Sequence, residues 1–130
     1  MKGPAVLKLR LPIPPSVNHS HHSININGRL MRVPSKASKS WTKECVVACA
    51  EAMNRCGWPT PCDCKTIVDY WIWWPDKRRR DPSNLEKVML DGLEAGGVIV
   101  DDKWCLPRCQ DFTVDRGNPR VEVACRRWGA

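Results

Sequence analysis

The chain has 130 residues, with 21 lysines and arginines against 14 aspartates and glutamates, and a formal net charge of +7 at pH 7. This length suits a modest hydrophobic core, so we expect residues 1–130 to form a single domain. The positive charge favours an anionic partner, of which nucleic acid is the commonest and a membrane surface the alternative. No apolar run approaches the roughly 20 residues of a membrane span, which argues against a membrane-spanning protein. Residues 1–15 lack the apolar core and cleavage site of a signal peptide, so we expect the chain to act in the cytoplasm.

The sequence contains eight cysteines, which is many for a cytoplasmic chain. Disulfide frameworks belong mainly to small secreted proteins, so we expect reduced, partly buried thiols. Cys45 and Cys49 are four residues apart on the apolar side of an expected helix and are predicted to lie in the core. The residues that leave a zinc site open are Cys62, Cys64, Cys105, Cys109, His19, His21 and His22. Their spacing offers at most half of a usual zinc site, so a zinc-stabilised module remains an alternative.

The first half of the chain predicts a strand, a hairpin and a helix, in that order. Residues 5–11 alternate apolar and basic side chains, which predicts a half-buried strand. Asn27 and Gly28 stand between two short strand-like runs, a strong signal for a hairpin turn. Residues 38–56 carry apolar side chains at helical spacing, and Gly57 is expected to end that helix.

The second half predicts a strand, a second helix and further strands. The expected elements are a central strand over 65–74, a loop over 75–80, a helix over 81–97, a short strand over 98–100, and a closing hairpin formed by 110–116 and 120–127. Trp71, Trp73 and Trp74 lie on the expected central strand and are predicted to belong to the core or to a dimer face. The order of elements predicts an α+β fold with a mixed β-sheet and two main helices.

The second expected helix has two distinct faces. Asp81 followed by Pro82 is a typical helix start, with the aspartate at the N-cap position. The buried stripe is expected to consist of Leu85, Val88, Met89 and Leu93. The polar positions Asp81, Asn84, Lys87 and Asp91 are three, three and four residues apart and therefore share another face.

Two further aspartates, Asp101 and Asp102, follow the short apolar stretch after this helix. A turn back along the helix would bring them near Asp81. Carboxylate oxygens are typical ligands of Mg²⁺, a lysine on the same face neutralises charge, and nearby arginines bind phosphate. The residues therefore predict a magnesium site for phosphodiester chemistry.

These residues resemble the RusA-type Holliday junction resolvases, which are small dimeric endonucleases. The family pattern of an arginine run, D-x-D-N-L-x-K, a further D-x-L and a closing D-D corresponds to Arg78-Arg79-Arg80-Asp81, Asn84-Leu85, Lys87, Asp91-Gly92-Leu93 and Asp101-Asp102. The amino-terminal LPIPPSVNH and the Asn27-Gly28-Arg29 turn are also similar, so the resemblance covers nearly the whole chain. It implies a RusA-like fold, a homodimer and cleavage of four-way junction DNA with Mg²⁺, for which Mn²⁺ is expected to substitute.

The resemblance also implies roles for single residues. Asp81, Lys87 and Asp102 are implied to be catalytic, with Asp81 and Asp102 as metal ligands. Ser83 stands where the family has a third aspartate, so its hydroxyl would bind the metal only through water. Asp101 or Asp91 would then be candidates to replace the missing carboxylate. The implied DNA contacts are Lys77, Arg78, Arg79, Arg80 and Asn84.

Each of these features has an ordinary explanation when it is taken alone. Asp81 is a helix cap, Lys87 and Asp91 form a surface ion pair, Asp101 and Asp102 belong to a turn, and residues 77–80 are a solvated charged run. Together and in this order they favour a Mg²⁺-dependent endonuclease that resolves four-way junctions by paired nicks. The resemblance also implies a prophage origin, because the family is common in prophages. The alternatives are a junction-binding protein weakened in catalysis by Ser83, and the zinc-stabilised module.

Overall fold

The computed structural model describes residues 5–15, 21–59 and 63–128. Its main sheet has the strand order β1-β6-β4-β5, with the strands β1 (Leu7–Leu11), β4 (Thr66–Trp74), β5 (Cys105–Val114) and β6 (Arg120–Arg127). β6 runs antiparallel to both β1 and β4, whereas β5 runs parallel to β4. The predicted α+β fold with a mixed sheet is therefore confirmed.

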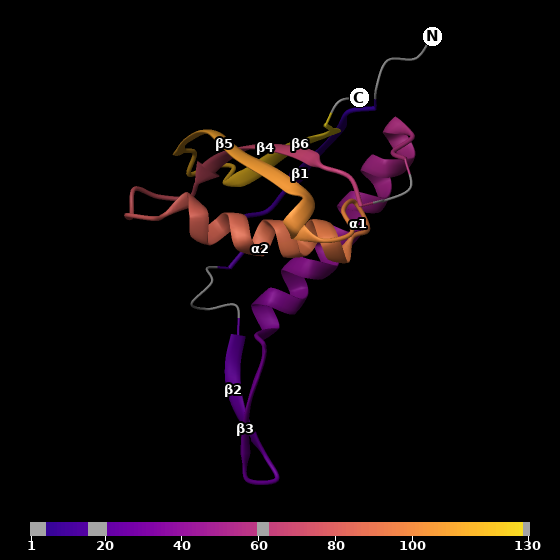
Figure 1. Cartoon of the computed structure of the whole chain (residues 1–130). Helices are drawn as coiled ribbons and strands as arrows, with labels where there is room; N and C mark the ends of the chain where they lie inside the picture. Colours follow the sequence, from indigo (N-terminus) through magenta and orange to yellow (C-terminus); the bar gives the residue numbers. More distant parts are fainter. Residues whose placement is uncertain (1–4, 16–20, 60–62, 129–130) are drawn as a thin grey trace.

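Two helices, α1 (Lys36–Cys56) and α2 (Pro82–Ala95), lie on the same side of this sheet (Figure 1). The buried core joins alternate residues of β1, β4 and β6 to one stripe of each helix. In α1 the stripe consists of Trp41, Cys45, Cys49 and Ala52, as the helical spacing predicted. Within the described residues, no helix is both long and apolar enough to cross a membrane.

The predicted hairpin is confirmed as β2 (His21–Ile26) and β3 (Arg29–Pro34), which project away from the sheet (Figure 1). Asn27 and Gly28 have φ angles of 53° and 80°, the left-handed conformation that a two-residue hairpin turn requires. The end of α1 is equally local, because Gly57 at φ 66° donates its backbone N–H to the carbonyl of Met53.

The predicted strand over 98–100 is wrong, because those residues form bends and irregular backbone. Val98 and Ile99 are buried, but the backbone groups of Val98 are used elsewhere. Its N–H donates to the carbonyl of Leu93 at 3.0 Å, and its carbonyl accepts from the Trp58 indole at 3.1 Å. The segment closes the end of α2 instead of joining a strand ladder.

The predicted closing hairpin is also wrong. β5 begins at Cys105 instead of residue 110, and β4 lies between β5 and β6, so the two strands are not hydrogen-bonded partners. The apolar strand β4 forms ladders on both of its sides, and this satisfies its backbone groups in the middle of the sheet. Local turn residues at 115–119 could not reveal this insertion.

The cysteines are mostly as expected. Cys45 and Cys49 are buried free thiols with sulfur atoms 4.0 Å apart, and Cys56, Cys105, Cys109 and Cys125 are also free. Cys64 is disulfide-bonded, so the expectation of reduced thiols is wrong at that position.

Candidate active site at the polar face of α2

Asp81 is fixed by the start of α2. It is the N-cap residue, and its Oδ1 accepts hydrogen bonds from the Ser83 backbone N–H at 3.0 Å and from the Ser83 hydroxyl at 2.8 Å. These hydrogen bonds lower the pKa of the Asp81 carboxyl, the backbone bond most, so it is ionised at neutral pH. Ser83 therefore contacts the Asp81 carboxylate, which is the predicted metal ligand, directly.

Lys87 lies further along the same face, between two carboxylates. Its Nζ is 3.4 Å from Asp91 Oδ1 and 3.4 Å from Asp102 Oδ2. The charge of Asp91 is the first cause, and the hydrogen bonds to Asp91 and Asp102 further causes, of a raised Lys87 pKa, which keeps the ammonium protonated. All three side chains are substantially exposed, so the cluster is open to a ligand from solvent.

The return of the chain after α2 brings Asp102 to this face. Gly97 at φ 81° turns the backbone, and the buried residues Val98 and Ile99 fasten the following segment against the core. Asp101 then caps the short helix η2 (Asp102–Trp104) by accepting from the Lys103 backbone N–H at 3.0 Å, which lowers the Asp101 pKa. Asp102 thus meets Lys87 although they are 15 residues apart.

The predicted metal ligands do not form a closed cage. Within the described part of the chain, no three His, Cys, Asp or Glu side chains are close enough together to hold a metal ion. Asp81 and Lys87 are six residues apart, which is about 9 Å along a helix axis. Asp102 and Asp91 both contact the Lys87 ammonium at this distance from Asp81, whereas Asp101 accepts the Lys103 backbone N–H at its own helix start.

The four cations before α2 differ in their surroundings. Arg80 is held by Asp76, with Nη1 2.6 Å from Oδ1, and its guanidinium lies 5.3 Å from the Trp74 ring centroid. The hydrogen bond from Arg80 and, after it, that from the Arg78 backbone N–H lower the pKa of Asp76 to about 2. Arg78 has 83% of its side chain exposed, and Lys77 and Arg79 are exposed as well. Three cations are thus exposed to a ligand, although Arg78 Nε also lies 3.8 Å from Asp76 Oδ2, and Arg80 shapes the loop.

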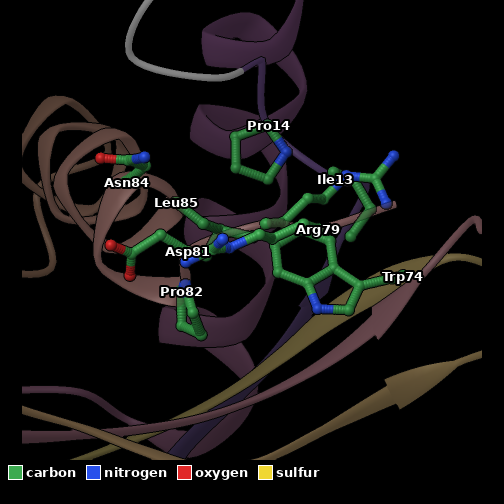
Figure 2. Close-up of a pocket in the computed structure, with 9 residues that line it drawn as sticks. Ile13, Pro14, Trp74, Arg79, Asp81, Pro82, Asn84 and Leu85 are labelled. Atoms are coloured by element: carbon green, nitrogen blue, oxygen red, sulfur yellow. The ribbon is translucent and has the colours of Figure 1, made fainter. Parts of the chain in front are cut away.

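A pocket of about 590 Å³ opens beside Asp81 (Figure 2). Its apolar walls are formed by Ile13, Pro14, Trp74, Pro82 and Leu85. Its polar lining comes from Arg79, Arg80, Asp81 and Asn84. The pocket therefore joins the segment after β1, the end of β4 and the first turn of α2.

Several of these residues escaped the sequence analysis. The spacing of Asp76 and Arg80 could not have indicated their ion pair, because the four-residue rule for charge pairs applies to helices and these residues lie in the loop before α2. The Tyr70 hydroxyl, which donates to Glu86 at 2.7 Å and so ties β4 to α2, has no local signal. Burial is the first cause of the raised pKa of Tyr70, which keeps the hydroxyl protonated as a donor.

The structure describes only some of the residues that left a zinc site open. His19 and Cys62 lie outside the described residues, and the side chains of His21 and His22 are likewise not described. Of the others, Cys105 and Cys109 are free thiols and Cys64 is disulfide-bonded. Burial raises the pKa of the Cys105 thiol to about 11, which disfavours the thiolate that zinc requires.

Comparison with known proteins agrees with the motif around α2. The family model described as endodeoxyribonuclease RusA matches residues 12–126, and no curated protein matches the chain. RusA proteins are endodeoxyribonucleases that act on Holliday junctions, and they generally depend on a divalent metal. The match contains residues 77–80, which we call the cation loop, together with all of α2 and the closing Asp101-Asp102 pair. The chain therefore belongs to the RusA endodeoxyribonuclease family.

Proposed function

We propose that this chain is a Mg²⁺-dependent endonuclease that resolves four-way DNA junctions by paired nicks. The observation that carries the proposal is the contact between Lys87 and Asp102, which brings the closing aspartate to the helix face that begins with Asp81. Carboxylates, a protonated lysine and a cationic loop on one exposed surface suit a phosphodiester substrate.

The donor set suits a metal held jointly by protein and DNA. Mg²⁺ commonly uses one or two carboxylates together with water and substrate phosphate, so Asp81 and Asp102 would hold it once DNA is bound, although Asp102 contacts Lys87 in the free chain. Asp101, Asp91 and a Ser83-bound water are additional candidates for completing the site. When bound, the metal would activate water and neutralise charge on the phosphate, and Mn²⁺ is expected to substitute.

The remaining residues would bind and orient the DNA. Lys87 stays protonated beside two carboxylates and would stabilise negative charge that develops on the phosphate. Lys77, Arg78 and Arg79 would hold the backbone at any sequence, because phosphate contacts position the duplex without reading bases. Asn84 would add a neutral donor, and Arg80 would act mainly by fixing the loop.

A homodimer completes the proposal. Two symmetric nicks require two active sites, and one chain carries a single set of these residues. The second candidate is a junction-binding protein with weakened catalysis. It is favoured by one contact, because Ser83 replaces a family aspartate and occupies Asp81 Oδ1 with its hydroxyl.

Cleavage of a synthetic four-way junction in Mg²⁺ tests the proposal. Asp81→Asn and Asp102→Asn should each lower cleavage at least about 100-fold, since even outer residues of metal sites matter 10- to 100-fold. Binding in Ca²⁺ should survive, because asparagine keeps the shape and also caps helices well. Asp63→Asn, on an exposed bend, is the matched control. Full cleavage by either site variant would refute the assignment, and binding without cleavage by wild type would support the second candidate.

A further inference from the structure

The pocket beside Asp81 has an apolar lining, which binding of the DNA sugar-phosphate backbone does not explain. Phosphates need cations and donors, yet Trp74 and Leu85 are only 7% and 4% exposed and present apolar surface to this hollow. Its volume of about 590 Å³ lies in the range of small-molecule pockets, about 300–1,000 Å³. An apolar slot of this size suits a flat aromatic group.

The walls of the pocket are held open by contacts outside it. The Trp41 indole donates to the carbonyl of Pro12 at 2.8 Å and anchors the segment that contributes Ile13 and Pro14. Arg80 lines the pocket but is held by its 2.6 Å contact with Asp76, so it does not fill the hollow. The site is therefore preformed, which lowers the ordering cost of binding.

The rim supplies groups that recognise a nucleotide. Asn84 is exposed at the first turn of α2 and offers both an amide donor and a carbonyl acceptor, the pair that reads base edges. Arg79 adds an exposed cation for the adjoining phosphate. Figure 2 shows these two side chains on different sides of the slot formed by Pro14, Ile13 and Trp74.

We infer that this pocket receives a nucleobase that is unstacked at the branch point of the junction. The inference rests on the proposed function, because it makes the pocket a second contact of the same DNA strand next to Asp81. Taking a base out of a stack costs a few kcal/mol in a continuous duplex and least where pairing is already disturbed. Binding of this base would therefore favour branched DNA over a continuous duplex, and it would not require contacts to the other bases of the DNA sequence.

Filling the pocket tests this inference in a binding assay that needs no cleavage. Fluorescence anisotropy in Ca²⁺ compares an intact junction with junctions in which each nucleotide flanking the branch point is made abasic in turn. Ile13→Trp should weaken binding to the intact junction about tenfold, within the range that base stacking contributes. One abasic position should restore the affinity of this variant to within about twofold of wild type on the same DNA, because no base then needs the pocket.

A second variant guards against misfolding. Asn84→Ala changes an exposed side chain, so it should fold normally and weaken binding about fivefold only when the same base is present. The controls are Val6→Trp and Glu94→Ala, which alter exposed residues outside the pocket and should bind as wild type.

The outcomes separate the two proposals. If wild type binds and cleaves the junction but both pocket variants bind as wild type, or lose affinity equally on every abasic junction, the base pocket is refuted and the nuclease stands. If wild type binds no junction, the nuclease and the pocket fall together.

Discussion

The fourteen residues of α2 form two faces with different surroundings, because one face packs against the protein core and the other meets solvent. The inner face packs Leu85, Met89 and Leu93 into the core, whereas the outer face exposes Asn84, Lys87 and Asp91. The contacts of the inner face join α2 to α1 and to the main sheet, and the fold requires them. Outer contacts join Lys87 to Asp102, which folding does not need, because exposed ion pairs contribute little stability. The difference separates residues kept for stability from those available for function.

The largest effect should come from the outer face. Lys87→Met keeps an unbranched side chain but removes the charge between Asp91 and Asp102, and we expect cleavage to fall about 100-fold. The free energy of unfolding should change by less than about 1 kcal/mol. Junction cleavage and urea unfolding measure the two quantities, with the exposed α1 variant Lys39→Met as control. Normal cleavage would leave Lys87 as an ordinary surface ion pair.

The inner face should respond in the opposite way. A Cβ at Gly92 would lie 2.6 Å from one Trp41 ring atom and 2.8 Å from Cys45 Sγ, so α1 and α2 would have to move apart. Gly92→Ala should lower the free energy of unfolding by about 1–3 kcal/mol, although alanine favours helix by up to about 1 kcal/mol. Urea denaturation checks this against Glu94→Ala, an exposed change on the same helix. A more stable Gly92→Ala would mean that the helices tolerate a wider separation.

The cation loop offers a finer contrast between neighbours. Arg79→Ala should reduce the slope of log affinity against log salt by about 0.9, the value of one phosphate contact. Arg80→Ala should leave that slope nearly unchanged, because Asp76 and Trp74 already engage this guanidinium. Equal changes in slope would show that Arg80 exchanges Asp76 for phosphate when DNA binds.

The Arg80 variant also predicts a change in acid stability. Arg80 is the first cause, and the Arg78 backbone N–H the second, of an Asp76 pKa lowered to about 2 from an ordinary value near 3.9, so these contacts stabilise the fold above about pH 4. This contribution is lost as the pH falls from about 4 to about 2. Arg80→Ala should therefore lose less stability than wild type over that interval, as measured by urea unfolding at each pH.

The smallest expected effect concerns Ser83. Ser83→Asp should lower the Mg²⁺ concentration for half-maximal cleavage a few-fold, because Ser83 already contacts Asp81 and a third carboxylate would join the site. Ser83→Ala is the matched control, since it removes the hydroxyl without adding charge. An equal or higher Mg²⁺ requirement in Ser83→Asp would mean that the extra charge crowds Asp81 instead of binding metal.

Local chemistry explains what could be predicted from the sequence. The start of α2 at Asp81, the end of α1 at Gly57 and the turn at Asn27-Gly28 depend on residues within a few positions of one another. The family pattern depends on order and spacing, which the sequence also contains. The two helix ends and the hairpin turn were confirmed because capping and positive φ angles are decided within a single turn of chain. The family pattern was confirmed by the match over residues 12–126.

The tertiary structure decided which distant groups meet. Only packing reveals that β4 separates β5 from β6, that Val98 gives its backbone groups to Leu93 and Trp58, and that Asp102 meets Lys87. The pocket likewise requires segments about seventy residues apart in the chain. The sequence by itself determined the elements and the chemical groups on them, because those follow from short-range sterics and periodicity. The surroundings of each group depended on how buried apolar surfaces were shared among strands and helices, and that is a property of the whole chain.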